Sequence, residues 1–405
     1  MATFTIERLG HHGDGIARGP IFVARTLPGE VVEGETDGTR LSSPRIITPS
    51  TDRVSPTCRH FKTCGGCSLQ HASDAFVARW QQDVVTRALE AVGLSAPLRR
   101  LHTSPPASRR RATFTGKRTK KGAVIGFHAP SSDTLIGVPD CKIIRPSLAA
   151  AIPALEEITR AGASRKSALR LSVTDTDTGL DVSVADGKPI DPALHQTLIA
   201  ISNEAGFARL SWDDEVLAQR AAPILMMGTA PVPIPPGAFL QATAEGSAAL
   251  LSSVEDAVGP AKKVVDLFAG CGTFTLPVSL KSEVHAVESE QSLLDALNGG
   301  WRHATSVKRV TTERRDLFRR PLTPDELQAF DAIVIDPPRA GAEAQMIEIA
   351  AAKVQRIASV SCNPVTFARD VAILTNSGYK LDWIDIVDQF RWSPHIEIAA
   401  GLSFS

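Results

Sequence analysis

The segment DLFAGCGTF, residues 266–274, decides the fold class of this chain. It follows a short apolar stretch, 264–267, and leads into a stretch of helical character, 273–280. Glycines at such a strand-to-helix turn let the backbone approach a ligand closely. The segment therefore predicts the first strand–turn–helix unit of a doubly wound α/β domain, in which ligands bind at the carboxyl ends of the strands.

The remainder of the C-terminal region repeats this alternation. Apolar stretches of strand length recur at 284–287, 332–335 and 357–361, a helix is expected from about residue 291, and two strands near 380–387 and 396–403 close the chain. Strands that alternate with helices favour a parallel sheet covered on both faces. We therefore expect a Rossmann-like domain over residues 237–405.

The residues in and after the glycine loop limit which class of ligand it can bind. The next strand ends at Glu288, and an acidic residue at about this spacing commonly accepts hydrogen bonds from ribose hydroxyls. The loop lacks the full GxGxxG pattern and the lysine of a Walker loop, which argues against a pyrophosphate. A nucleoside without phosphates, such as S-adenosylmethionine, fits better. The alternative is a glycine turn that binds nothing.

Two further strands end in residues that carry chemistry. Asp336 of DPPRAG follows strand 332–335, and Cys362 of SCNP follows strand 357–361. A helix beginning after Pro364 would favour the thiolate of Cys362 as a nucleophile. The alternatives are a capping aspartate and an inert buried cysteine. Glu397, in the last strand, is a weak signal by itself.

The cysteines are unevenly distributed. Cys58, Cys64 and Cys67 cluster within ten residues, and Cys141 lies further along the chain. Four thiolates suit either zinc or an iron–sulfur cluster, and spacing alone leaves both open, as well as four unrelated cysteines.

The N-terminal region differs in pattern. Short strands near 4–6, 21–23, 30–33 and 45–48 predict a small β-barrel over residues 1–50. A helix capped by Ser73 is expected to reach residue 92. Residues 99–121 then contain nine Lys or Arg residues and no Asp or Glu. That block is either a phosphate-binding surface or a solvated loop. Residues 51–236 are assigned to a central α/β domain that ends at the proline-rich stretch 231–236.

Composition sets the class of protein. The 405 residues carry no net charge and 43% are hydrophobic, as in globular proteins. No apolar run is long enough to span a bilayer, and residues 1–10 lack the apolar core of a signal peptide. We therefore expect a cytoplasmic protein without a membrane partner.

Taken together, the motifs resemble the bacterial S-adenosylmethionine-dependent RNA uracil-5-methyltransferases, over nearly the whole chain. GIARGPIFVARTLPGEVVEGE (15–35) is similar to the TRAM domain of some members, and CRHFKTCGGC (58–67) with Cys141 is similar to their 4Fe–4S ligands. The catalytic motifs occur in the family's order: PPGAFLQA (235–242), DLFAGCGTFTLP (266–277), DPPRAG (336–341), SCNP (361–364) and PHIE (394–397).

The resemblance implies a role for each matched residue. The methyl-donor site falls on Gln241, Phe268, Thr273, Glu288 and Asp316, with Asp336 close by at the uracil. The nucleophile falls on Cys362 and the base on Glu397, while Cys58, Cys64, Cys67 and Cys141 would hold a 4Fe–4S cluster. Thr273 departs from the family, which usually has asparagine there.

The TRAM-like segment together with the cysteine cluster looks like the branch that modifies 23S ribosomal RNA. A transfer-RNA uracil-5-methyltransferase is the alternative within the family, and relatives of that type usually lack both features. A non-catalytic RNA-binding protein and a cytosine methyltransferase are further alternatives. RNA is the expected partner, and the sequence indicates no obligate protein partner.

Overall fold

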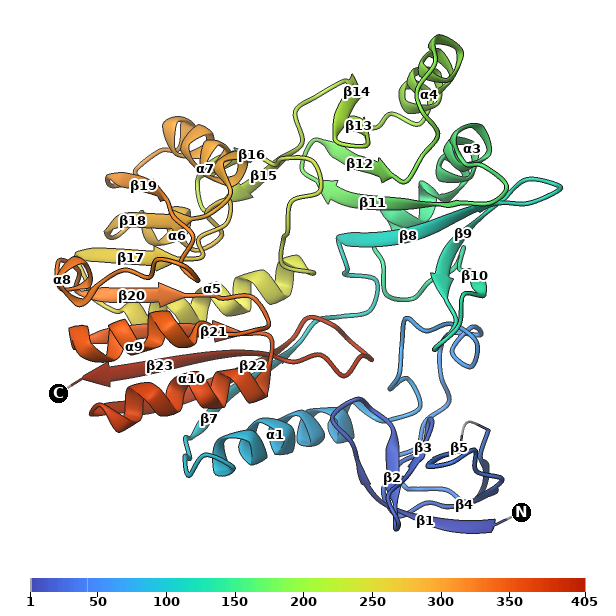
Figure 1. Cartoon of the computed structure of the whole chain (residues 1–405), viewed down its shortest axis with the longest axis horizontal. Helices are drawn as coiled ribbons and strands as arrows, with labels where there is room; N and C mark the ends of the chain where they lie inside the picture. The colour runs from blue at the N-terminus through green and yellow to red at the C-terminus, as the bar shows by residue number, and fades with distance from the viewer. Residues whose placement is uncertain (1, 42, 405) are drawn as a thin grey trace.

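The computed structural model describes residues 2–41 and 43–404. Figure 1 shows a small sheet at the N-terminus, a central sheet with helices on it, and a large layered domain that ends the chain. Among the described residues, no helix is both long and apolar enough to cross a membrane.

The N-terminal strands form one six-stranded sheet in the order β5-β3-β2-β1-β4-β6. The four strands expected from the sequence overlap β1, β3, β4 and β6. Ile6, Val23, Val32 and Leu41 fill the core of this sheet. The bounds are β1 (Ala2–Leu9), β2 (Gly15–Ala17), β3 (Ile21–Val23), β4 (Val31–Gly34), β5 (Arg40–Leu41) and β6 (Arg45–Thr48).

Helix α1 (Asp74–Glu90) connects the N-terminal sheet to the rest of the molecule. The Ser73 side chain accepts a hydrogen bond from the backbone N–H of Phe76, which confirms the expected cap. One face of α1 buries Val77 and Trp80 against Leu9 of β1. The same helix places Val85 in the core of the C-terminal domain, so it joins two hydrophobic cores.

The central domain is built on a seven-stranded sheet in the order β10-β9-β8-β11-β12-β13-β14. Two of its neighbouring strands, β11 and β12, form an antiparallel hairpin. The bounds are β8 (Arg111–Arg118), β9 (Ala123–His128), β10 (Leu135–Gly137), β11 (Ala168–Thr176), β12 (Gly179–Ala185), β13 (Arg209–Trp212), β14 (Glu215–Gln219), α2 (Pro146–Ala150), α3 (Ile152–Gly162) and α4 (Pro192–Glu204).

The C-terminal domain has an eight-stranded sheet in the order β19-β18-β17-β20-β21-β23-β22-β7, and β23 is antiparallel to both of its neighbours. The bounds are β7 (Leu98–Thr103), β17 (Lys263–Leu267), β18 (Glu283–Glu288), β19 (Val310–Arg314), β20 (Ala332–Ile335), β21 (Arg356–Ser361), β22 (Tyr379–Asp388) and β23 (Glu397–Phe404).

Helices cover both faces of this sheet, as expected for a doubly wound domain (Figure 1). The core on one face takes side chains from α1, α8, α9 and α10, and the core on the other takes them from α5, α6, α7 and the hairpin β15–β16. The bounds are α5 (Ala244–Val258), α6 (Thr275–Val278), α7 (Gln291–His303), α8 (Pro324–Leu327), α9 (Glu343–Ala352), α10 (Pro364–Asn376), β15 (Ile224–Met227) and β16 (Ala230–Pro233). Helix α6 is shorter than the stretch 273–280 expected from the sequence.

Two segments of the range 51–236 pack with the C-terminal domain instead of the central sheet. Strand β7 hydrogen-bonds in parallel to β22, where Arg99 forms a bidentate ion pair with the buried Asp385 and lies over the ring of Trp383. The hairpin β15–β16 packs on α7. A division of the chain at residue 237 therefore misses both segments, because strand pairing and apolar burial join them to a sheet that lies far along the sequence.

Candidate functional site

A cavity of about 420 Å³ lies at the carboxyl ends of β17, β18 and β20. The loop after β17 forms its floor, and this loop contains three residues with positive φ: Phe268 at 62°, Gly270 at 57° and Gly272 at 96°. Positive φ is rare for a bulky residue such as phenylalanine, so the surrounding structure must hold it there. The expected glycine turn is present, and it opens onto a cavity.

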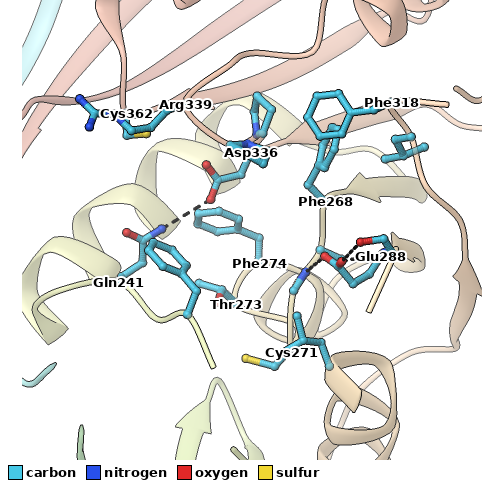
Figure 2. A pocket seen from close by; sticks show the side chains of 18 of the residues that line it. Gln241, Phe268, Cys271, Thr273, Phe274, Glu288, Phe318, Asp336, Arg339 and Cys362 are labelled. Atoms are coloured by element: carbon cyan, nitrogen blue, oxygen red, sulfur yellow. Dashed lines mark hydrogen bonds between the residues drawn. The ribbon is translucent and has the colours of Figure 1, made fainter. Parts of the chain in front are cut away.

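The residues that line this cavity form two groups, one at each end. Glu288, at the end of β18, accepts a hydrogen bond from the backbone N–H of Gly270 over 3.0 Å, which joins the two loops. Phe268 and Phe318 lie with ring centroids 5.4 Å apart, and Asp316 accepts a hydrogen bond from the backbone of Phe318. Figure 2 shows Glu288 and the two rings at one end, and Gln241, Asp336 and Cys362 at the other.

A chain of hydrogen-bonded amide and carboxyl side chains crosses the end of the cavity that holds Cys362. The Gln241 amide nitrogen lies 3.5 Å from a carboxylate oxygen of Asp336 (Figure 2). The carbonyl oxygen of the same amide accepts a 2.5 Å hydrogen bond from Gln389, which also accepts one from the backbone N–H of Ala242. Gln389 is hydrogen-bonded to Glu397 as well. Gln389 is only 2% exposed, so its bonds fix the geometry of the site in a dry environment.

The sheet brings Cys362 and Glu397 to one place. In the antiparallel pair β21–β23, Ser361 lies opposite Ile398. Cys362 comes directly after Ser361 and Glu397 directly before Ile398, so the two side chains start from opposed positions. Both line the cavity, together with Asp336 from the neighbouring strand β20.

Burial raises the pKa values of the acidic groups in the site. Burial raises the pKa of Asp336 to about 7, and burial followed by the charge of Asp336 raises the pKa of Glu397 to about 8. Burial, then the charges of Glu397 and Asp336, raise the pKa of the Cys362 thiol to about 11, against the opposing charge of Arg339. Burial and the two carboxyls therefore oppose ionisation of this thiol in the free protein, and its activation by the start of α10 stays a prediction.

The four clustered cysteines line a separate cavity, of about 310 Å³, between the 58–67 loop and the central sheet. Burial, then the charges of the nearby Cys141, Cys64 and Cys58, raise the pKa of Cys67 to about 12, against the hydrogen bond with Gln70. In residues 2–41 and 43–404, no group of three or more His, Cys, Asp or Glu is arranged to hold a single metal ion.

The basic block 99–121 is divided by the fold. Arg99 and Arg100 form ion pairs on β7 with Asp385 and Asp256, so they are not free for a phosphate. The guanidinium of Arg110 donates to the backbone carbonyl of Gln241, within the protein. Lys117, Lys120 and Lys121 remain exposed around the β8–β9 turn. The ion-paired part of the block is therefore not a phosphate-binding surface, and phosphate binding by the exposed lysines stays a prediction.

Comparison with known proteins shows the family of this chain. A profile of the tRNA (uracil-5-)-methyltransferase family matches residues 234–403. RNA methyltransferases of Mesorhizobium japonicum and Brucella suis are 44% and 41% identical, and the alignments cover 99% and 98% of this chain and 98% and 97% of theirs. The chain belongs to the family of RNA uracil-5-methyltransferases. It is therefore an S-adenosylmethionine-dependent enzyme that methylates carbon 5 of uracil in RNA.

More distant relatives differ in their named substrates. The 23S rRNA (uracil(1939)-C(5))-methyltransferase RlmD of Shewanella piezotolerans is 29% identical, over 98% of this chain and 94% of its own length. The tRNA (uracil-54, C5)-methyltransferase of Pyrococcus abyssi, solved with S-adenosyl-L-homocysteine, superposes with a TM-score of 0.79 at 22% identity over 99% of both chains. The second comparison shows the fold of this chain.

The structure brings together all eight residues expected at the catalytic and donor sites, since each lines the same cavity: Gln241, Phe268, Thr273, Glu288, Asp316, Asp336, Cys362 and Glu397. The motifs did not single out Gln389, Arg339, Phe239 or Phe318. Arg339 lies within the quoted DPPRAG motif, and its charge was the available signal. Gln389 follows β22 in no recognised motif, so only its hydrogen bonds reveal it.

Proposed function

We propose that this enzyme methylates a uridine through a covalent adduct between Cys362 and carbon 6 of the base. One observation carries the proposal: Cys362, Glu397 and Asp336 lie at one end of the cavity whose other end holds the glycine loop and Glu288. A nucleophile, a base and a donor loop around one cavity are the parts that such a reaction needs.

The donor would lie along the glycine loop. Glu288 would accept hydrogen bonds from the ribose hydroxyls, and Phe268 with Phe318 would contact the adenine ring. Asp316 lies at the same end, and Thr273, within the glycine loop, also lines the cavity. A donor bound in this way would present its methyl group to the end of the cavity that holds Cys362 and Asp336.

The chemistry follows from the weak nucleophilicity of carbon 5. The Cys362 sulfur, once deprotonated, adds to carbon 6, and the electron pair of the 5,6 double bond moves onto the ring as an enolate. Carbon 5 then displaces S-adenosylhomocysteine from the methyl group. Glu397 removes the proton from carbon 5, the double bond re-forms, and the sulfur leaves. With a pKa near 8, Glu397 can both take and release this proton near neutral pH.

We propose large-subunit ribosomal RNA as the substrate, with the target uridine in a loop or other unpaired segment. The relation to RlmD supports this choice. The fold does not decide between ribosomal and transfer RNA, because the tRNA (uracil-54, C5)-methyltransferase of Pyrococcus abyssi superposes over 99% of both chains. The target base must leave its stack to reach Cys362, and an unpaired base does so at the lowest cost.

The test uses purified enzyme and labelled donor with protein-free large-subunit RNA and, separately, with unmodified transfer RNA. Mass spectrometry then maps 5-methyluridine in each product. We expect label in a single uridine of the ribosomal RNA. Strong labelling of transfer RNA with none in ribosomal RNA would favour the alternative substrate, and the absence of 5-methyluridine from both would refute the function itself.

We further propose that Cys58, Cys64, Cys67 and Cys141 hold a 4Fe–4S cluster. The fit rests on four thiols around one cavity of about 310 Å³ that also contains Phe61 and Phe127, so the group would be partly shielded from water. A cluster spreads its thiolate bonds over four irons, so its ligands need not converge on one point as they do for zinc. The cluster would tie the 58–67 loop to the central domain through Cys141, and the methyl transfer needs no electron from it.

A further inference from the structure

A second cavity opens beside the catalytic cysteine. It measures about 330 Å³, and its walls come from the N-terminal sheet, from α1 and from the loops of the C-terminal domain. Cys362 and Arg339 line both this cavity and the donor cavity. Cys362 therefore lies where the two cavities meet.

The side chains around the second cavity are strongly biased in charge. Its lining includes Arg8, His11, His12, Arg87, Arg339 and His395, and no aspartate or glutamate. Among the described residues, the guanidinium groups of Arg8, Arg87 and Arg339 form no ion pair with a carboxylate. Gathered cations without counter-charges repel one another, so an anion that binds among them gains their combined attraction.

Burial and nearby positive charges lower the pKa values of His11 and His395, which lie on opposite walls of the cavity. Burial, then the charges of His12 and Arg8, lower the pKa of His11. Burial, then Arg339, Arg109 and His12, lower the pKa of His395. His12 from the N-terminal sheet thus acts on His395 across the cavity, which indicates that the cations of both domains face a common space.

The loop that carries His11 and His12 is fixed in place. The backbone N–H of Gly10 donates to the carbonyl of Asp14, and that of Gly13 donates to the carbonyl of Gly10, which closes the loop between β1 and β2. Leu9, just before the loop, is buried in a cluster with side chains of α1. The loop is therefore presented to the cavity by a packed interface and is preorganised for binding.

We infer that this second cavity binds the RNA backbone next to the target uridine, with Arg8, Arg87 and Arg339 contacting phosphate. The inference rests on the proposed function, because it places the flanking phosphates where the target base enters the site at Cys362. Arginine suits phosphate oxygens through paired N–H donors, and the histidines add shorter-range hydrogen bonds. The N-terminal sheet is then part of the acceptor site and not a separate RNA anchor.

The test compares matched arginines. Arg8→Gln removes a cation of the cavity, and Arg18→Gln removes an exposed cation directly after β2 that does not line it. Arg87→Gln and Arg302→Gln remove cations from the last turns of α1 and α7, of which only the first lines the cavity. A fluorescent oligouridylate is titrated with each variant over a series of salt concentrations, and donor affinity is measured in parallel.

We expect Arg8→Gln and Arg87→Gln each to weaken RNA binding several-fold and to lower the slope of log affinity against log salt by about 1, as for one lost phosphate contact. The two control variants should keep the wild-type slope, and all four should bind the donor normally and unfold at the wild-type temperature. Wild-type slopes for both Arg8→Gln and Arg87→Gln would overturn the inference. Because binding is measured without turnover, a wild-type enzyme that forms no 5-methyluridine would refute the proposed function separately.

Discussion

Cys362 and Glu397 start from opposed positions of an antiparallel strand pair, next to the Ser361–Ile398 pair of β21 and β23. The insertion of β23 between β21 and β22 produces this relationship, because it reverses direction at the end of the parallel strands. A nucleophile at the end of one strand thus meets a carboxyl at the start of another.

Replacement of Cys362 by alanine should abolish methyl transfer, by about 10⁴-fold or more, because the ring is then never activated. Donor affinity, measured calorimetrically, should stay near wild type, since Glu288 and the glycine loop are at the other end of the cavity. A Cys362→Ala enzyme that still methylates at a comparable rate would contradict the covalent mechanism.

Replacement of Glu397 by glutamine should slow turnover by about 10²–10⁴-fold and let a covalent enzyme–RNA adduct accumulate, because elimination needs the base. The adduct is detected as a slower band on a denaturing gel. The double variant Cys362→Ala/Glu397→Gln is the control and should form none. If Glu397→Gln turns over slowly without any adduct, Glu397 acts before the sulfur is attached or is not the base.

Gln389→Leu should shift the pH dependence of turnover. The hydrogen bond from Gln389 lowers the pKa of Glu397, so its loss should raise that pKa further above 8. Glu397 acts as a base only when ionised, so the rising limb of the pH–rate profile should move to higher pH.

Gln345→Leu is the matched control for this shift. Gln345 is also buried and bonds both backbone groups of Leu322, but it lies away from the catalytic residues. It should destabilise the fold by about 1–3 kcal/mol without moving the profile. Equal pH profiles for Gln389→Leu and wild type would show that Gln389 does not position Glu397.

The preference for donor over product should grow with pH. S-adenosylmethionine carries a sulfonium cation and S-adenosylhomocysteine does not, and Asp336, with a pKa of about 7, attracts the cation only when ionised. The ratio of the two dissociation constants, measured from one pH unit below that value to one above, should change in favour of the donor. Asp336→Asn should flatten the change, and an unaltered slope in that variant would assign the effect to another group.

Anaerobic purification should give a brown protein with about four irons per chain. Cys67→Ser and Cys141→Ser should each lose iron and lower the unfolding temperature, because the cluster would join the 58–67 loop to the central domain. Cys271→Ser is the comparison for iron content, since Cys271 lies buried at the glycine loop and away from the other cavity. A colourless protein with one stoichiometric zinc would contradict the cluster.

The sequence by itself determined the doubly wound domain and the ligand end of its sheet. Local patterns suffice for this, because apolar stretches of strand length followed by glycine or proline turns mark the carboxyl ends of parallel strands. Asp336 and Cys362 could therefore be assigned to one crevice from their positions after strands. The family resemblance added Glu397, Gln241 and the order of the motifs.

Only the tertiary structure decided the rest. The transfer of β7 into the C-terminal sheet depends on pairing with β22, far along the chain, and no local pattern records it. The same pairing removes Arg99 from the basic block, because Asp385 neutralises it. The raised pKa of Cys362 likewise depends on burial and on two carboxyls that other strands bring to it. Burial and charge act through space, so these properties exist only once the strands are in place.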